Sequence, residues 1–520
     1  MQVGDVAGID RSATAGDSTA LREADAPGEA LELVSSLCRA LHDAGIRYCH
    51  WKSNESLDRS ASGENDLDLL VLRSDARLFE GVLRELGFRD AQLPPWKELP
   101  GVYHSYAVDR VSGHFVHIHA HYQLVIGDDM TKNYHLPIEV AYLASARPVA
   151  PFMVPAPEFE LGLLLIRMVI KHCTWDAFLM LQSSLSKSER RELDDLLARV
   201  DLADVWALLS RHIPFVGPEL WQRCLRAVMP GASVRSRIRT ASTLQAELAV
   251  WARRLRAVDT SLRIWRRFRT LARRKVFRRG PVAHRLAGGG VLIGIVGGDG
   301  AGKTTALEGL TRWLATENFF AVTVHMGKPG WSLLSATVKS SMKVVASVKR
   351  RPTSSASSLR STLATQGGSM DVRDRARLVW EVLTARDRSR TYRRARRLAS
   401  NGEIVICDRY PLPQVAGMDG AVTARAKDPA RLRGLAKALA TREKRYYERI
   451  RYPDVLIVLR VHPDLAVQRK AGVEPESTVR PRSEEIWQLD WADTPAIVVD
   501  AAASKDEVLC EIKSLIWSRL

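Results

Sequence analysis

The feature that most constrains this chain is a glycine-rich stretch ending in a lysine, because few local folds accommodate so many residues without side chains. The stretch reads Gly297, Gly298, Asp299, Gly300, Ala301, Gly302, Lys303, Thr304 and Thr305, which fits the pattern G-x-x-x-x-G-K-[ST]. An apolar run at 291–296 precedes it, and Leu307, Leu310 and Leu314 follow at helical spacing. A buried strand, a glycine loop and an amphipathic helix are the context in which this pattern holds phosphate groups. The sequence therefore predicts a phosphate-binding loop between a strand and a helix.

Each residue type in this loop has a chemical role. Glycines let backbone N–H groups turn inward around phosphate oxygens, and the helix N-terminus adds its own unpaired donors. Lys303 would bring a charge to the β- and γ-phosphates, and the Thr304 hydroxyl could ligate Mg²⁺. A chance glycine-rich turn is the alternative, and the predicted strand and helix argue against it. We predict that the chain binds a nucleoside triphosphate, ATP, together with Mg²⁺.

The composition narrows the class of protein. At 520 residues the chain is long enough for about three domains. Its net charge of +18 favours acidic partners such as phosphates, nucleic acid or an anionic membrane. Six scattered cysteines form no C-x-x-C pair, so a disulfide framework or cysteine zinc site is not expected and a reducing cytoplasm fits. The most apolar stretch, 161–181, includes Arg167, Lys171 and Asp176, which indicates a buried helix rather than a membrane span.

Changes in composition divide the chain into four segments. Residues 1–27 are rich in Ala, Gly, Asp and Ser and predict a disordered lead-in. A first domain is expected over 28–150 and a helical region over 151–285. A last domain follows over 286–520, with Gly288-Gly289-Gly290 at its boundary.

In the first domain, two aspartates alternate with apolar residues on a predicted strand. The stretch 63–71 reads GENDLDLLV, so Asp66 and Asp68 point to one face, where paired carboxylates commonly hold Mg²⁺. With the upstream Lys52-Ser53-Asn54, it resembles the metal-binding strand of the nucleotidyltransferase superfamily, in forms reading K-x-N and then G-x-x-D-L-D-L-L-V. The resemblance covers about residues 30–130 and implies an α+β domain. Both an active nucleotidyltransferase and a degenerate binding domain are open, and we favour the second.

The same domain departs from that family in two places. The usual Gly-Ser turn is missing, and the later strand that often supplies a third carboxylate carries His117, His119 and His121. Three alternating histidines on one strand face could ligate a transition metal. A solvated or hydrogen-bonded histidine row is the simpler interpretation. We favour it because no carboxylate or cysteine accompanies the three residues.

A strongly basic segment lies between residues 253 and 279, with many arginines, one lysine and only Asp259 as an acid. Its apolar residues recur at helical spacing, namely Val258, Leu262, Trp265, Phe268, Ala272 and Val276. The pattern predicts a basic amphipathic helix. Such a helix could dock on an anionic membrane or on nucleic acid. Docking on a membrane would place this otherwise cytoplasmic protein at the membrane surface. A helix that packs on its own protein is the alternative.

Downstream of the glycine loop, apolar strand patterns alternate with helical stretches, which predicts an α/β unit with a parallel sheet. One of these strands, at 403–408, ends in Asp408-Arg409-Tyr410. Opposite a phosphate loop, Asp408 can hold the Mg²⁺ shell, and Arg409 can grip an acceptor phosphate through two N–H groups.

Three motifs in this order are similar to those of thymidylate kinases: residues 298–305, Ala385-Arg386-Asp387-Arg388, and Asp408-Arg409-Tyr410. Strand-like stretches at 453–459 and 497–501 extend the resemblance over about residues 290–520. The resemblance implies a P-loop NTPase fold, with helices on both faces of a parallel sheet. It also implies that Asp299 approaches the acceptor sugar and that Arg388 and Arg409 contact the acceptor phosphate. The lid of the family falls on Arg469, Lys470, Arg480 and Arg482. Because the loop itself has no arginine, Arg469 or Arg480 would stabilise the transferring phosphoryl group.

After Tyr410 the chain departs from the family. A serine and an Ala-Tyr-Gln element near the base are replaced by the stretch 411–416, which reads PLPQVA. The sequence predicts a Mg-ATP-dependent nucleoside monophosphate kinase, with dTMP as the acceptor by resemblance. Two alternatives are open: a kinase for another phosphorylated or hydroxylated small molecule, and a non-catalytic ATP-binding switch or scaffold docked through the basic helix.

Overall fold

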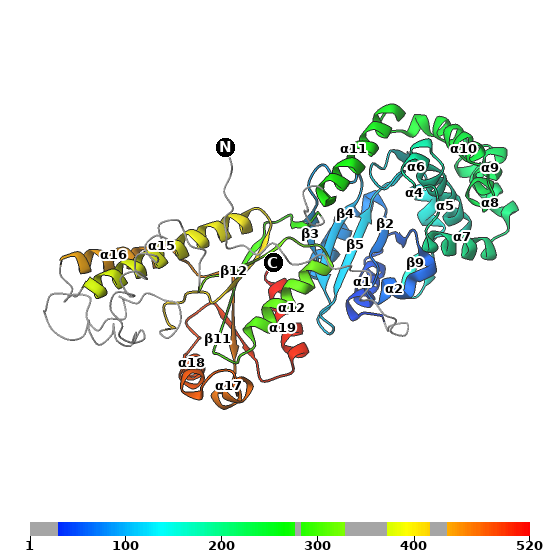
Figure 1. The fold of residues 1–520 in the computed structure, drawn as a ribbon. Coiled ribbons are helices and arrows are strands. Elements are labelled where there is room, and N and C mark those ends of the chain that lie inside the picture. Colours follow the sequence, from blue (N-terminus) through cyan, green and yellow to red (C-terminus); the bar gives the residue numbers. More distant parts are fainter. Residues whose placement is uncertain (1–29, 276–281, 328–371, 416–433) are drawn as a thin grey trace, which may run out of the picture. The chain divides into compact units, whose positions relative to one another are not determined.

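The computed structural model describes residues 30–275, 282–327, 372–415 and 434–520. The predicted lead-in at 1–27 lies outside the described residues, as does the stretch at 352–370, whose many Ser and Thr residues predict a loop. The described part is a mixed α/β structure of two compact units that divide between Ala287 and Gly288 (Figure 1). We call them the N-terminal unit and the C-terminal unit. Within the described ranges, no helix combines the length and apolar character needed to cross a membrane.

The N-terminal unit is built on a mixed sheet. Its strands and hairpins are β1 (Tyr48–His50), β2 (Leu67–Val71), β3 (Arg89–Gln92), β4 (Tyr103–Val108), β5 (Phe115–His121), β6 (Leu124–Ile126), β7 (Tyr134–Leu136), β8 (Arg147–Val149), β9 (Phe152–Val154) and β10 (Arg285–Leu286). Six of them form the sheet in the order β1-β2-β5-β4-β3-β10, whereas β6-β7 and β8-β9 are separate hairpins. β2 and β5 run parallel, and the other neighbours in the sheet are antiparallel.

Alternation along the strands gives this sheet one apolar and one polar face. Leu67, Leu69 and Val71 of β2 join Val116 and Ile118 of β5 in one apolar core with α1 (Glu32–Asp43) and α3 (Ala76–Glu85). Because successive side chains point to opposite faces, the histidines of β5 lie on the other face, together with the Asp68 carboxylate. The sheet therefore gathers its polar groups on the side that α1 and α3 do not cover.

A helical region completes the N-terminal unit. The remaining helices are η1 (Asn54–Ser56), α2 (Leu57–Ala61), η2 (Arg73–Asp75), α4 (Glu139–Ala144), α5 (Pro157–His172), α6 (Trp175–Leu179), α7 (Lys187–Arg199), α8 (Leu202–His212), α9 (Pro218–Val228), α10 (Val234–Glu247), η3 (Leu248–Trp251) and α11 (Arg256–Lys275). α6, α7, α8, α9 and α10 pack around α5, whose residues from Leu161 to Ile166 are all buried. The first half of the predicted 161–181 helix is therefore a core helix, but α5 ends at His172, and Leu179 and Leu181 beyond it are exposed.

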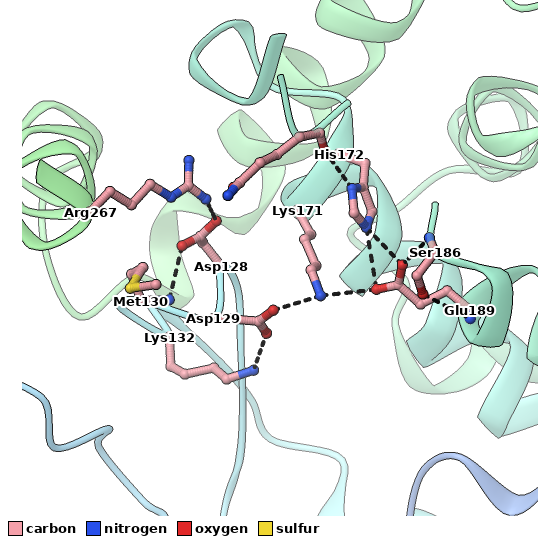
Figure 2. Close-up of polar contacts among 10 residues, drawn as sticks. Asp128, Asp129, Met130, Lys132, Lys171, His172, Ser186, Glu189 and Arg267 are labelled. Atoms are coloured by element: carbon pink, nitrogen blue, oxygen red, sulfur yellow. Dashed lines mark hydrogen bonds and ion pairs between the residues drawn. The ribbon is translucent and has the colours of Figure 1, made fainter. Parts of the chain in front are cut away.

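A network of ion pairs joins the loop after β6 to three of these helices (Figure 2). Arg267 of α11 pairs with Asp128 of the loop. Lys171 of α5 lies between Asp129 of the loop, at 2.6 Å, and Glu189 of α7, at 2.9 Å. These bridges fix the β6-β7 hairpin to the helical region.

α11 is a basic amphipathic helix, but its polar side faces inward. The Arg263 and Arg267 side chains are 1 % and 7 % exposed, whereas Trp265 and Phe268 are 48 % and 70 % exposed. Arg263 Nε lies 3.0 Å from the Asp176 carboxylate. These two arginines bind carboxylates of their own unit, which fits the alternative that the helix packs on its own protein.

The C-terminal unit is built on a sheet of five parallel strands. They are β11 (Val291–Gly297), β12 (Ala321–His325), β13 (Ile404–Asp408), β14 (Val455–Arg460) and β15 (Ala496–Asp500), in the order β12-β13-β11-β14-β15. Every residue of β11 is buried. The prediction of a parallel sheet built on apolar strands is confirmed.

Helices cover both faces of this sheet. They are α12 (Lys303–Thr316), α15 (Val372–Ser400), α16 (Gly434–Tyr447), α17 (Pro463–Lys470), α18 (Glu476–Gln488) and α19 (Lys505–Ser518). Tyr392 and Ala395 of α15 share one core with Leu292 and Val296 of β11, whereas α12 and α19 lie on the opposite side (Figure 1). The chain leaves β11 toward β12 and leaves β13 toward β14, so the winding reverses between β11 and β13. Ligand sites of open parallel sheets lie at the carboxyl ends of strands at such a point.

Candidate functional sites

The glycine-rich loop connects β11 to α12 at this point of reversal. Gly300 and Gly302 have φ angles of +83° and +84°, which residues with side chains rarely adopt. A Cβ atom on Gly300 would lie only 2.6 Å from the backbone oxygen of Ala466. α12 begins directly after Gly302, so the unpaired N–H groups of its first turn open onto the loop.

Lys303 places its ammonium group inside the loop. Its Nζ donates hydrogen bonds to the backbone oxygens of Gly297, at 2.9 Å, and Gly298, at 2.7 Å. The Asp299 carboxylate lies 3.9 Å from the same nitrogen. Burial lowers the pKa of Lys303, and the charge of Asp299 partly offsets this effect. The loop therefore encloses a cation that can exchange backbone oxygens for those of a phosphate.

Asp408 ends the strand next to the loop. It lies opposite Ile295 of β11 on one side and opposite His325 of β12 on the other. The His325 Nδ1 atom is 2.8 Å from Asp408 Oδ2. Burial raises the pKa of Asp408, but His325 and the charge of Lys303 outweigh that effect, so the pKa is lowered overall. Asp408 is thus held as an oriented carboxylate at the carboxyl end of β13.

Arg409, the next residue, has a φ angle of +52°. This left-handed conformation is uncommon for a residue with a long side chain and costs of order 1 kcal/mol or more. Strain of this kind is concentrated at functional sites, where surrounding structure imposes it. Here it turns the chain sharply after β13 and leaves the Arg409 side chain on the wall of a cavity.

The loop, Lys303, Asp408 and Arg409 together line this cavity of about 760 Å³. The predicted residues on its wall are Asp299, Gly300, Ala301, Gly302, Lys303, Thr304, Thr305, Asp408, Arg409, Arg469 and Lys470. His325, Glu474 and Lys505 add charged or titratable side chains to the wall. Because the cationic side chains outnumber the carboxylates, the cavity suits a polyphosphate bound together with a cation.

Arg388 is placed differently from what the resemblance implies. Its guanidinium donates to the backbone oxygens of Met326, at 3.0 Å, and Gly327, at 2.9 Å, and to the Tyr447 hydroxyl at 2.6 Å. The residue is 6 % exposed and is not part of the cavity wall. In this structure Arg388 braces the backbone beyond β12 instead of pointing into the site.

The two arginines of α18 are also outside the cavity wall. Arg480 pairs with Asp464 at 2.7 Å and Glu476 at 2.8 Å. Arg482 donates to Asp299 Oδ2 at 2.7 Å, so it contacts the loop through a carboxylate. Of the predicted lid residues, Arg469 and Lys470 alone reach the wall in the described structure.

The stretch after Tyr410 is a packing element. Leu412 and Val415 are buried in the core on the α15 side of the sheet, and the Gln414 side chain donates to the Tyr452 hydroxyl at 2.6 Å. The described residues at the position where the resemblance would place a base-binding element therefore do not line the cavity. Ala416, the last residue of this stretch, lies outside the described residues.

The N-terminal unit has a second cavity, of about 500 Å³, with Asp66 and Asp68 on its wall. Lys52 Nζ lies 2.9 Å from Asp68 Oδ1. The segment at Ser53 and Asn54 is held by two carboxylates, because the Ser53 N–H donates to Glu192 and the Asn54 side-chain amide to Glu160. Carboxylate oxygens at a cavity are ligands that a hard cation such as Mg²⁺ prefers, but Lys52 already pairs with Asp68, and Mg²⁺ binding here stays a prediction.

Both aspartates also contact the histidines of β5. His117 Nδ1 is 2.8 Å from Asp66 Oδ1, and His119 Nδ1 is 3.3 Å from Asp68 Oδ1. His121 Nε2 lies 3.7 Å from the same Asp68 oxygen. Our expectation that no carboxylate accompanies the histidine row is therefore wrong. The carboxylates come from the neighbouring parallel strand, which the spacing within one stretch of sequence could not show.

Sequence reasoning missed four further histidines near these sites: His50 on the wall of the second cavity, His284 beside His104, and His325 and His104 themselves. His325 ends β12, and it could have been predicted from the sequence. A strand parallel to β11 and β13 must end at the same edge of the sheet as they do. His104 of β4 had no such signal, because only the register between β4 and β5 brings it to His119.

No protein-family model matches the chain, and no curated protein matches its sequence. A functional conclusion must therefore come from the chemistry of the two sites.

Proposed function

We propose that the C-terminal unit is a P-loop phosphotransferase, which moves the γ-phosphoryl group of Mg-ATP to a nucleoside monophosphate. The acceptor implied by the resemblance is dTMP. The observation that carries the proposal is the convergence of Lys303, Asp408 and Arg409 on one cavity at the carboxyl ends of β11 and β13. The order of the strands supports it, because the winding of the sheet reverses at that position.

The side chains present fit the groups that such a reaction requires. The loop N–H groups and Lys303 would hold the β- and γ-phosphates. The Thr304 hydroxyl and the Asp408 carboxylate supply the oxygen ligands that Mg²⁺ prefers, and both line the cavity. Bound there, Mg²⁺ would neutralise charge on the phosphates. Arg409 and Arg469 would stabilise the charge that develops on the transferring group, where fixed donors are most effective.

A second candidate is a kinase with another phosphorylated or hydroxylated acceptor. Two observations favour it: Arg388 is occupied by backbone oxygens and a tyrosine hydroxyl, and the 411–415 stretch packs in the core. These are the positions where the resemblance would place recognition of the acceptor. Among the described residues, the side chains that would hold the donor line the cavity, whereas Arg388 and the 411–415 stretch do not.

The test is the turnover of Mg-ATP by the full chain against a panel of nucleoside monophosphates and phosphorylated sugars. Lys303→Ala is the inactive variant, and Lys444→Ala, at an exposed lysine of α16, is the matched control. A phosphorylated product that requires Lys303 supports phosphotransfer, and its identity decides between the two candidates. No product from any acceptor, with Mg-ATP still bound, would refute phosphotransfer and favour the ATP-dependent switch.

A further inference from the structure

We propose that His104, His117 and His119 of the N-terminal unit form a binding site for one divalent transition-metal ion of the zinc class. The inference concerns a different unit and a different chemistry from the proposed phosphotransfer, and it does not depend on that proposal.

The strand register brings the three rings together. His117 and His119 are two residues apart on β5, so they share a face, and His104 of β4 is the direct cross-strand partner of His119. One nitrogen from each ring lies within 4.8 Å of the others. Their rings are in contact, with centroids 4.8 Å apart for His104 and His119 and 4.3 Å apart for His117 and His119. The cluster is therefore a consequence of the sheet and does not depend on a loop.

The distances between nitrogens suit a shared metal ion. His104 Nδ1 and His117 Nε2 are 3.1 Å apart. Two nitrogens bound to one zinc ion at about 2.0–2.1 Å in tetrahedral geometry lie about 3.3 Å apart, so this pair needs almost no adjustment. Imidazole nitrogens select zinc, copper, iron or nickel over Mg²⁺. The site thus differs in metal class from the Mg²⁺ site predicted at the two aspartates alone.

The groups behind the rings match those of known metal sites in proteins. A histidine that ligates a metal usually donates its other N–H to a carboxylate, which fixes the ring and its tautomer. Asp66 accepts from His117 Nδ1 at 2.8 Å, and Asp68 lies 3.3 Å from His119 Nδ1. Lys52 in turn holds Asp68 at 2.9 Å. Without a metal ion, His104 Nδ1 and His117 Nε2 are close enough to share a hydrogen bond, and a bound ion would replace that contact by ligating both nitrogens.

The test uses the full chain, stripped of metal with a chelator and titrated with Zn²⁺ and with Co²⁺ in the absence of nucleotide. We expect one ion per chain and the intense visible absorption of tetrahedral Co²⁺. His104→Gln, His117→Gln and His119→Gln should each weaken binding at least about 100-fold, and Asp66→Asn about 10- to 100-fold. His42→Gln, at an exposed histidine of α1, is the matched control and should bind as the unaltered chain does.

A second readout uses the unaltered chain, so its outcome does not depend on whether the variants fold. In the Co²⁺-loaded chain, three paramagnetically shifted imidazole N–H signals are expected, one from each ligand. Substoichiometric or purely octahedral Co²⁺ binding, fewer than three such signals, or unchanged affinity in the folded histidine variants would each overturn the assignment.

Discussion

Glu160 offers a quantitative test of how the N-terminal unit is packed. It lies at the start of α5, is 4 % exposed, and accepts a hydrogen bond from the Asn54 side chain at 2.9 Å. Burial raises its pKa from the ordinary 4.5 to about 7; the hydrogen bond from Asn54 opposes this increase and the charge of Glu192 adds to it. The perturbation is Glu160→Gln, which keeps an oxygen for Asn54 but cannot ionise.

The magnitude comes from the two pKa values. Between pH 4.5 and about 7 the folded state keeps a proton that the unfolded chain releases, so the free energy of unfolding falls as the pH rises. The whole interval corresponds to about 3 kcal/mol, and the loss is complete once the pH exceeds the folded pKa. The glutamine variant has no such loss. Its stability relative to the unaltered chain should therefore rise by about 3 kcal/mol from pH 4.5 to pH 8.

The assay is native-state hydrogen exchange of the amides of α5 in the full chain, with both proteins compared at each pH. Core amides of this kind exchange through opening of the whole unit, so their protection reports its stability. Glu158→Gln on the same helix is the matched control for loss of a carboxylate. A stability difference that stays constant with pH, or that falls as the pH rises, would refute the assignment of a buried, protonated Glu160.

Three further predictions concern single groups. Asp176→Ala leaves the Arg263 guanidinium buried without its main partner and should lower the stability of the N-terminal unit by about 3–5 kcal/mol, measured by calorimetry. Adding Arg263→Met should restore most of the lost stability. A double variant as unstable as Asp176→Ala would contradict the ion-pair account. Gly300→Ala should weaken Mg-ATP binding about tenfold or more, because alanine is strained at a φ of +83°; unchanged binding would mean that the loop does not need this conformation. His325→Ala should lower kcat about tenfold with a small change in KM, because His325 orients the Asp408 carboxylate. His325→Asn keeps a hydrogen-bond donor and should lose less activity. An equal loss in both variants, together with no recovery in excess Mg²⁺, would contradict that role.

The C-terminal sheet could be predicted because its signals are local. The three central strands β11, β13 and β14 are largely buried and mostly apolar, and the glycine loop marks the turn from β11 into a helix. Asp408 could be predicted for the same reason, since it ends such a run. The sequence could not show that Arg388 would be taken up by the Met326 and Gly327 carbonyls, because those contacts depend on how α15 packs beside β12.

The N-terminal unit shows the complementary limit. The apolar spacing of α11 is a reliable signal for a helix, but periodicity alone cannot say which side faces the protein. Here Asp176 and Asp128 receive Arg263 and Arg267, so the polar side is buried. The meeting of His104 with His119 likewise depends on register, which the turn between two strands determines and a motif does not record.

The central claim is that the cavity at the ends of β11 and β13 holds Mg-ATP through Lys303. The most direct measurement is titration calorimetry of Mg-ATP with the full chain, the Lys303→Ala variant and the Lys444→Ala control. The account predicts one Mg-ATP per chain, with affinity reduced about 10- to 100-fold in Lys303→Ala, as expected for loss of a charged hydrogen-bond donor, and unchanged in the control. No binding by the unaltered chain, or equal affinity in all three proteins, would contradict it.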